Sequence, residues 1–356
     1  MNNNTSVFGT ASRLLLAVIL VAASTNAPCL AADEAKLTAE ELQEGWLQFF
    51  DGTSTLGWKI TGDAKVKDHT LILGGEKETT ATPDLLLPTI KHLVQLKMSW
   101  TGKKPPTVET ADGNISEFMV NSTKDDVNVF GWGNPAKSGN KVVVPVSLKI
   151  PAGTTVRLHY LRLNINSDFT SLFNGKDLTG WKLFPGDKYK SQYTVTKEGY
   201  LNVKDGPGDL QTATKHDNFL LHLECISNGK HLNSGIFFRC LPDVYQQGYE
   251  MQIRNEWMGD DRTKPVDFGT GAIYRRQPAS QVVSTDGEWF HATLYANKNH
   301  LRTWVNGIPV VSWHDDRAAD VNARKGYCAG AGHISIQGHD PTTDLSFRNL
   351  RIVDLK

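Results

Sequence analysis

Polar side chains capable of chemistry gather on one alternating segment, Tyr249–Arg254. Successive side chains of an extended strand point to opposite faces, so Glu250, Gln252 and Arg254 share one face of this segment. A carboxylate, an amide and a guanidinium in one row offer a titratable group together with donors and acceptors for hydroxyl groups. The same alternation is common on antiparallel strands whose polar side faces solvent, so the pattern alone leaves both interpretations open.

A second titratable group, the pair His339 and Asp340, lies in the turn Gln337–Pro341 directly after a strand-like run. Glycine and proline restrict this loop, and functional side chains are often held on loops of this kind. The structural alternative is a surface histidine beside an Asp-Pro turn. The pair is therefore a candidate for proton transfer or ligand binding.

Two further residues are candidates for ligand binding. Arg239 follows an apolar run and is either a charge at the rim of the sheet or a planar donor to hydroxyl and carboxylate groups. Tyr274 follows Gly271 and Ala272, small residues that let a ligand approach closely. Its ring suits core packing, a hydrogen bond through the hydroxyl, or stacking on a sugar ring.

Short strand-like runs must position these side chains. The runs are Phe219–Cys225, Gly235–Cys240, Tyr249–Arg254, Trp289–Ala296, Leu301–Val305 and Ile308–Val311. Asn306-Gly307 predicts a tight turn between the last two. A short helix is predicted within Leu37–Gln48, with Thr38 and Glu41 as a capping box. Many short strands without βαβ alternation predict an all-β sandwich or jelly roll.

The chain repeats a phrase at the start of each half. Residues 173–182 read FNGKDLTGWK, and residues 50–59 contain the shorter FDG and LGWK. The ends repeat as well, with 146–149 and 161–163 in the first half matching 334–337 and 350–352 in the second. The two ends are offset by 188 to 189 residues, and a period this long indicates two duplicated domains rather than a solenoid.

The two copies differ in their titratable residues. Pro151 and Ala152 stand where the second copy has His339 and Asp340. The segment Ile115–Val120, in the middle of the first copy, has no Glu-x-Gln-x-Arg face. The comparison favours a single competent site, which lies in the second copy.

Residues 1–32 have the features of a secretory signal. Arg13 precedes an apolar run at 14–23, and small residues follow as far as Ala31-Ala32. The run is short for a membrane span, and an uncleaved anchor is the alternative. We therefore expect an exported, periplasmic or extracellular protein without a transmembrane segment after signal removal. The expected division is a signal at 1–32, a degenerate β module at 33–167 and a jelly-roll domain at 168–356.

The composition limits the partners. Lysine plus arginine and aspartate plus glutamate both number 38, so no net charge attracts nucleic acid or an anionic membrane. Cys225, Cys240 and Cys328 follow the signal, and an odd number leaves at least one thiol unpaired. Cys225 and Cys240 stand in apolar runs, which favours buried thiols, with a disulfide between them left open. The oligomeric state is not set by the sequence.

Several phrases of the second half, together with residues 173–182, resemble the 3-keto-disaccharide hydrolase family of exported bacterial proteins. They are Asn233–Arg239, Gly248–Ile253, Thr270–Tyr274, Gly287–Trp289, Trp304–Gly307, Gly332–His339 and Phe347–Ile352. The resemblance covers all of the second module and only the two ends of the first. It implies a concanavalin-like jelly roll of two curved antiparallel sheets, and cleavage of glycosides whose sugar carries a ketone at C3.

On that resemblance the Glu250 face is a sugar groove and a carbohydrate is the partner. A C3 ketone acidifies the proton at C2, so the reaction needs a base, an acid for the C1 leaving group and a donor for the enolate. Glu250 and His339 are the acid and base candidates, in an order left open. The candidates for substrate binding and orientation are Arg239, Gln252, Arg254, Tyr274 and Asp340.

The fold alone does not decide between catalysis and binding. A lectin-like carbohydrate-binding module would have the same architecture and groove, and an interaction scaffold is a third interpretation. The loop acids Asp209, Asp260, Asp261 and Asp267 offer oxygen ligands for calcium, although no EF-type loop is present. Charged loop residues are mostly solvated, so no cofactor is assigned, and calcium or another divalent ion is left open.

Overall fold

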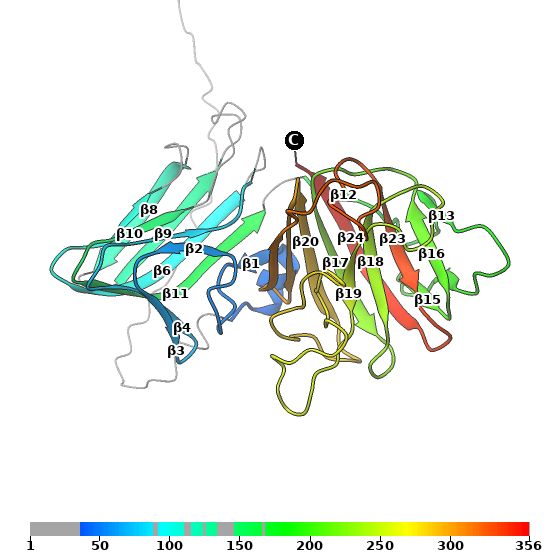
Figure 1. Ribbon diagram of the computed structural model, residues 1–356, viewed down its shortest axis with the longest axis horizontal. Coiled ribbons are helices and arrows are strands. Elements are labelled where there is room, and N and C mark those ends of the chain that lie inside the picture. Colours follow the sequence, from blue (N-terminus) through cyan, green and yellow to red (C-terminus); the bar gives the residue numbers. More distant parts are fainter. Residues whose placement is uncertain are drawn as a thin grey trace, which may run out of the picture.

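The structure is a computed structural model that describes residues 36–87, 92–109, 115–123, 126–133, 146–165 and 168–355, with the backbone alone for 115–133. The expected signal at 1–32 lies outside this part of the chain. Figure 1 shows two groups of sheets side by side, with α2 and β1 between them. We call the part up to residue 165 the first module and the part from residue 168 the second module.

The first module contains two antiparallel sheets. Its strands are β1 (Trp46–Gln48), β2 (Trp58–Thr61), β3 (Ala64–Lys67), β4 (Thr70–Gly75), β5 (Thr79–Pro83), β6 (His92–Gly102), β7 (Thr107–Glu109), β8 (Ile115–Thr123), β9 (Asp126–Gly133), β10 (Ser147–Ile150) and β11 (Thr154–Ile165). The larger sheet has the order β3-β4-β11-β6-β9-β8, and β1 also pairs with β11. The smaller sheet has the order β2-β5-β10-β7.

The second module repeats this two-sheet plan on a larger scale. Its strands are β12 (Thr170–Ser171), β13 (Trp181–Leu183), β14 (Gln192–Val195), β15 (Leu201–Lys204), β16 (Gly208–Thr212), β17 (Phe219–Ser227), β18 (Ser234–Cys240), β19 (Tyr249–Ile253), β20 (Phe290–Asn297), β21 (His300–Val305), β22 (Ile308–His314), β23 (His333–Gly338) and β24 (Asp344–Asp354). The larger sheet has the order β14-β15-β24-β17-β20-β21-β22, with β12 on β24, and the smaller one β13-β16-β23-β18-β19. The predicted all-β jelly-roll sandwich is confirmed.

The predicted helix begins where expected and ends early. Helix α2 (Ala39–Glu44) carries the full capping box between Thr38 and Glu41. Gly45 ends it in a left-handed conformation with φ of 88°, which glycine adopts without a steric penalty. The chain then continues as β1, whose residues pair with β11, so the last three residues of the predicted helix form a strand.

One hydrogen bond recurs in both modules. The Trp58 indole donates to the carbonyl of Phe49 at 2.9 Å, and the Trp181 indole donates to the carbonyl of Leu172 at 2.7 Å. In both modules the acceptor lies nine residues before the tryptophan. The repeated phrases therefore make the same local fold, which supports their common origin.

A hydrophobic seam joins the two modules. Leu220, Tyr295 and Trp304 lie on the side of β17, β20 and β21 that faces away from the second module's own core. They are buried in the hydrophobic cluster of the first module, together with Leu355. This side of the larger sheet of the second module is therefore covered by the first module, and it would be exposed without it.

Polar groups fix the same seam. The Trp304 indole donates to the carbonyl of Gln48 at 2.7 Å, and the Tyr295 hydroxyl donates to the carbonyl of Leu86. The fully buried Arg302 guanidinium donates to the carbonyls of Gly57 and Asp84. Burial lowers the pKa of Arg302 to about 10. Separation of the two modules would remove the carbonyl acceptors of this desolvated cation. The buried Arg302 therefore disfavours their separation.

The described residues show the state of the three cysteines. Cys225, Cys240 and Cys328 are all free and buried, so the disulfide left open between Cys225 and Cys240 is absent. No helix in the described part of the chain is long and apolar enough to span a bilayer.

Replacing Trp304 with alanine tests the seam. We expect the Trp304→Ala variant to lose about 3–5 kcal/mol of unfolding free energy, because it opens a large cavity between the modules and leaves the carbonyl of Gln48 without its donor. Urea titration followed by far-UV circular dichroism measures the loss. The matched control is Trp257→Ala, which removes a partly exposed loop tryptophan and is expected to cost about 1 kcal/mol or less. Equal losses in both variants would contradict a cooperative seam.

Candidate active site

The five-stranded sheet has a polar side opposite the core, and we call this side the polar face. Tyr249, Met251 and Ile253 of β19 lie in the core between the sheets, as the alternation predicts. Glu250 and Gln252 therefore lie on the polar face. This face is not a solvated surface, because Glu250 is only 6% exposed and Gln252 only 1%.

Neighbouring strands place further polar side chains on this face. Leu210 and Ile336 belong to the core, so Asp209 of β16 and Ser335 and Gln337 of β23 point the opposite way. Asp209 pairs with Gln337 in the sheet register. All three polar residues are at most 2% exposed. The polar face is thus a desolvated layer that spans several strands.

Loops cover the polar face. The backbone N–H of Gln246, in the loop between β18 and β19, donates to Asp209 Oδ2 at 3.0 Å. The Arg324 guanidinium donates to the carbonyl of Gln246 at 2.9 Å and to Glu250 Oε2 at 3.3 Å. Arg324 therefore connects the covering loop to the Glu250 carboxylate.

Glu250 lies beside a cavity of about 200 Å³ lined by Gly248, Tyr249, Glu250, Tyr274, Arg275, Arg276, Ala323 and Arg324. The backbone N–H of Tyr274 donates to the carbonyl of Glu250 and so holds Tyr274 beside the cavity. The segment that contains Tyr274 thereby lies along the edge of the sheet next to β19. A Cβ atom on Gly235 would lie 2.7 Å from Glu250 Oε1. Glycine at this position lets the Glu250 side chain lie across β18.

The carboxyl groups of Glu250 and Asp209 have strongly raised pKa values. Burial raises the pKa of Glu250 to about 7 against the opposing effect of Arg324, and the negative charges of Asp267 and Asp209 add to the rise. Burial also raises the pKa of Asp209 to about 7, although the hydrogen bond from the Gln246 N–H favours its ionised form. Both groups can therefore exchange protons near neutral pH.

Several buried oxygen atoms on this face have no hydrogen-bond donor. They are Asp209 Oδ1, Gln252 Oε1, Ser335 Oγ and Gln337 Oε1. The Gln252 amide nitrogen is fixed by the carbonyl and carboxylate of Asp267, so its oxygen is left as the free acceptor. Unpartnered buried acceptors are unfavourable, and a ligand that supplies hydroxyl donors would satisfy them.

The expectation for Arg239 is wrong. A register shift between Phe237 and Cys240 interrupts β18, and Arg239 adopts a left-handed φ of 53°. Its guanidinium donates to the backbone carbonyls of Asp217, Lys298 and Cys328, and the residue is 2% exposed. The bulge therefore turns Arg239 away from the polar face and makes it a structural cation.

The structure does not bring His339 to Glu250. His339 Nδ1 lies 2.8 Å from Asp340 Oδ2 in the loop after β23, and neither residue is among the charges that most affect the pKa of Glu250. Neither His339 nor Asp340 lines the cavity beside Glu250. Thr342 donates to the other Asp340 oxygen, so Asp340 is held within its own turn. An acid–base pair of Glu250 with His339 is therefore not supported by the geometry.

Arg254 is also engaged elsewhere. Its guanidinium forms an ion pair with Glu256, two residues along the chain. Asp260 and Asp261 lie in the connection after β19, where Asp261 accepts hydrogen bonds from Thr263, whereas Asp209 and Asp267 lie near Glu250. Among the described residues, these four aspartates do not form a metal-binding cluster.

Two members of the site have weak sequence signals. Asp209 stands in the run Gly208–Thr212, whose alternation around Leu210 could have placed it on the polar face, but its sequence context indicated only a calcium ligand. Arg324 comes from an irregular loop some 70 residues beyond Glu250, and no periodicity marks it. Tertiary structure alone brings Arg324 to the site.

Stability should depend on pH through Glu250. Its folded pKa of about 7 lies above its usual value of 4.5, so its favourable contribution is complete below pH 4.5 and is lost as pH rises through 7. We expect Glu250→Gln to become more stable relative to wild type by up to about 3 kcal/mol between pH 4.5 and pH 8. Chemical denaturation at several pH values measures this change. Glu198→Gln, in an exposed turn, is the control, and parallel profiles for Glu250→Gln and wild type would contradict the desolvated carboxylate.

Three known proteins similar to this chain each cover more than half of it. A Bacteroides thetaiotaomicron protein named 3-keto-disaccharide hydrolase is 25% identical over 265 residues, which cover 62% of this chain and 90% of that protein. A solved structure described as a candidate glycosyl hydrolase, from Parabacteroides distasonis, is 24% identical with a TM-score of 0.43, covering 53% of this chain and 94% of that one. The carbohydrate-binding module CBM66 of Bacillus subtilis is 13% identical with a TM-score of 0.35, covering 51% and 98%.

The family model described as 3-keto-alpha-glucoside-1,2-lyase-like domain matches residues 168–353. This segment contains both sheets of the second module, including Asp209, Glu250 and Arg324 of the polar face. Since the match spans more than half of the 356 residues, the chain belongs to the family of 3-keto-alpha-glucoside-1,2-lyase-like domains.

Proposed function

We propose that this protein is an exported enzyme that cleaves the glycosidic bond of sugars with a ketone at C3, by elimination followed by hydration. The family and the name of the Bacteroides relative support this class of substrate. Export rests on the signal-like residues 1–32, with the degenerate module at 33–167 and the catalytic domain at 168–356.

The observation that carries the proposal is the pair of buried carboxyl groups, Glu250 and Asp209, each with a pKa of about 7. Near neutral pH such a pair holds one proton more readily than two or none, because the Asp209 charge disfavours ionisation of Glu250 across the polar face. One group then acts as a base and the other as an acid in the same turnover. Glu250 is assigned as the base because it lines the cavity beside Tyr274 and Arg324.

The proposed reaction starts at C2. Glu250 takes the C2 proton, and the electron pair of that bond forms an enolate with the C3 ketone. The enolate collapses to a C1=C2 double bond and expels the C1 oxygen, which takes a proton from Asp209 and leaves as an alcohol. Water then adds at C1, and a proton returns to C2. The net result is hydrolysis, with no oxidant or reductant consumed.

The Arg324 guanidinium stabilises the charge that forms on the enolate oxygen. It lies 3.3 Å from Glu250 Oε2 and is the cation that most strongly opposes the rise in the Glu250 pKa. A fixed cation in a desolvated site acts more strongly on developing charge than it would in water. When the base becomes neutral, Arg324 loses its partner and is free to pair with the enolate.

Sugar hydroxyl groups would satisfy the unpartnered acceptors. Gln252 Oε1 and Gln337 Oε1 on the polar face lack donors, and a sugar presents several hydroxyl donors at once. Phe184, Tyr189 and Tyr245 form an aromatic group whose ring centroids are 5.1–6.1 Å apart. This group lies close to Asp209, whose charge helps to raise the Tyr245 pKa, and it offers a surface on which a sugar ring can stack.

Exchange chemistry tests this mechanism. In heavy water, turnover of a 3-keto-glucoside should place deuterium at C2 of the released 3-keto sugar, and NMR detects it. Glu250→Gln should lower both bond cleavage and C2 exchange by about 10²–10⁴-fold, because the base is lost. His339→Ala is the control and should keep both within a few fold.

Three results would redirect the assignment. Cleavage without deuterium at C2 would indicate direct displacement at C1. Equal loss in His339→Ala and Glu250→Gln would return His339 to the site. Tight sugar binding without cleavage or exchange, across several keto-glycosides, would favour a lectin-like module.

The pH dependence provides a separate test. Two interacting carboxyl groups with pKa values of about 7 should give a bell-shaped profile of kcat/KM with its maximum near neutral pH. Asp209→Asn should remove the alkaline limb, because the general acid no longer ionises. Steady-state kinetics between pH 5 and pH 9 measures both limbs. A profile that stays flat through this range would contradict the assignment of these two groups.

A further inference from the structure

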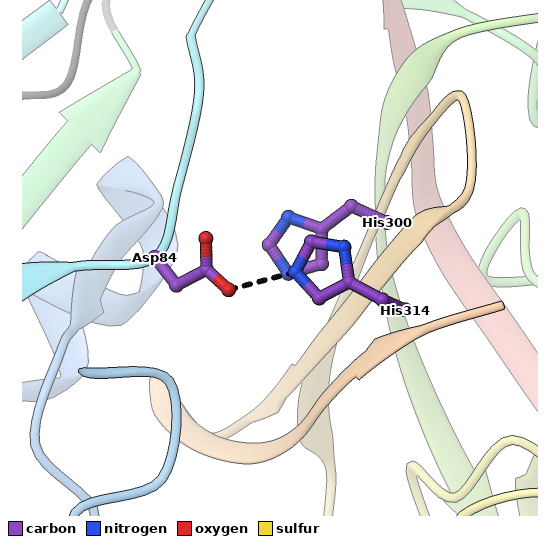
Figure 2. A group of neighbouring side chains, drawn as sticks. All are labelled: Asp84, His300 and His314. Carbon is purple, nitrogen blue, oxygen red and sulfur yellow. Dashed lines mark hydrogen bonds and ion pairs between the residues drawn. The ribbon is translucent and has the colours of Figure 1, made fainter. Parts of the chain in front are cut away.

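A cluster of metal-binding side chains lies at the seam, away from the polar face. Asp84 follows β5 of the first module, whereas His300 and His314 lie on β21 and β22 of the second and are paired in the sheet register. Figure 2 shows the Asp84 carboxylate facing the edges of both imidazole rings. The rings are stacked, with centroids 4.1 Å apart and planes 9° from parallel.

The three side chains have the chemistry of a transition-metal site. One ligand atom from each can be chosen so that all three lie within 4.8 Å of one another, and no other such group of three occurs among the described residues. Two imidazole nitrogens and one carboxylate oxygen form a common donor set for zinc and related divalent ions. His314 Nε2 already lies 2.7 Å from Asp84 Oδ2, so a proton occupies part of the space that an ion would take.

The cluster is poorly satisfied without a ligand. His300 is 4% exposed and its Nδ1 has no hydrogen-bond partner, while its Nε2 contacts the Ser312 hydroxyl at 3.2 Å. The two stacked rings form no hydrogen bond with each other, because parallel imidazoles direct their nitrogen lone pairs side by side. A buried imidazole with an unpartnered nitrogen is unusual unless another group completes it.

The surroundings also limit the choice of ion. Lys59 forms an ion pair with Asp84 Oδ1 at 2.7 Å, which leaves Oδ2 for a metal. The buried Arg302 lies against the backbone carbonyl of Asp84. Two nearby positive charges oppose a cation held by charge alone, such as calcium, so coordination by imidazole must supply the affinity. The His314 side chain is 38% exposed, which provides a path for the ion and for water ligands.

We propose that Asp84, His300 and His314 bind a divalent transition-metal ion of the zinc class, and that this ion joins the two modules. The His314–Asp84 proton leaves when the ion binds. Zinc–nitrogen bonds of about 2.0–2.1 Å lie near the plane of each ring, so the stacked imidazoles must rotate apart to share one ion. Water completes the coordination on the exposed side of His314.

Metal titration of the full chain tests the proposal. After dialysis against a chelator, isothermal titration with zinc chloride should give one ion per chain, and saturating zinc should raise the Tm by at least about 3 °C. Asp84→Asn and His314→Gln should each weaken zinc binding by roughly 100-fold or more and abolish the Tm shift, because each removes one of only three protein ligands. Cobalt(II) should give visible d–d bands in wild type that both variants lack.

Matched controls keep the outcome decisive. His69→Gln, which removes an exposed histidine of the first module, should bind zinc as wild type does. Glu250→Gln should also bind normally, since Glu250 belongs to a different site. The proposal is overturned if wild type takes up no stoichiometric zinc, if Asp84→Asn and His314→Gln bind as wild type does, or if Glu250→Gln alone abolishes binding.

Discussion

Desolvation of the polar face is the constraint on which the site depends. The five-stranded sheet must direct Met251, Ile253 and their neighbours into the core, so the alternate residues project outward together. Loops then cover that outward layer, and the Gln246 N–H and the Arg324 guanidinium provide partial compensation for the buried carboxylates. Compensation is incomplete, and the pKa values of Glu250 and Asp209 rise to about 7 for that reason. Exclusion of solvent from Glu250 and Asp209 lowers the stability of the fold. It also brings their pKa values near neutrality, where both groups can transfer protons.

The sequence predicted the parts of this arrangement that follow local rules. Strict alternation in Tyr249–Ile253 placed Glu250 correctly, and the capping box at Thr38 located the start of α2. The expected role of Arg239 as a rim charge or ligand donor failed, because a bulge changes the register of β18 and no residue in the sequence marks it. Arg324 could not be identified either, since it reaches Glu250 from an irregular loop. Local patterns report which side of a strand a residue occupies, but not which distant loop covers that side.

The two modules, which the sequence predicts to be copies, agree at some surfaces and differ at others. Both keep the indole hydrogen bond of Trp58 and Trp181, and both keep two antiparallel sheets. The first module has Pro151 and Ala152 where the second has His339 and Asp340, a loop that the site geometry does not require. The difference at these positions is therefore weaker support for a single competent site than it was at the level of sequence. The raised pKa values on the polar face of the second module are the stronger support.

The continuous core at the seam has an evolutionary consequence. Newly duplicated domains are usually separable, and either copy can be deleted without harm to the other. Here Tyr295 and Trp304 of the second module are completed by the first, and the Arg302 guanidinium uses carbonyls of the first as acceptors. Loss of the first copy would expose an apolar sheet and a desolvated cation at the same time. On the predicted duplication, the first module would be retained for the surface that it covers.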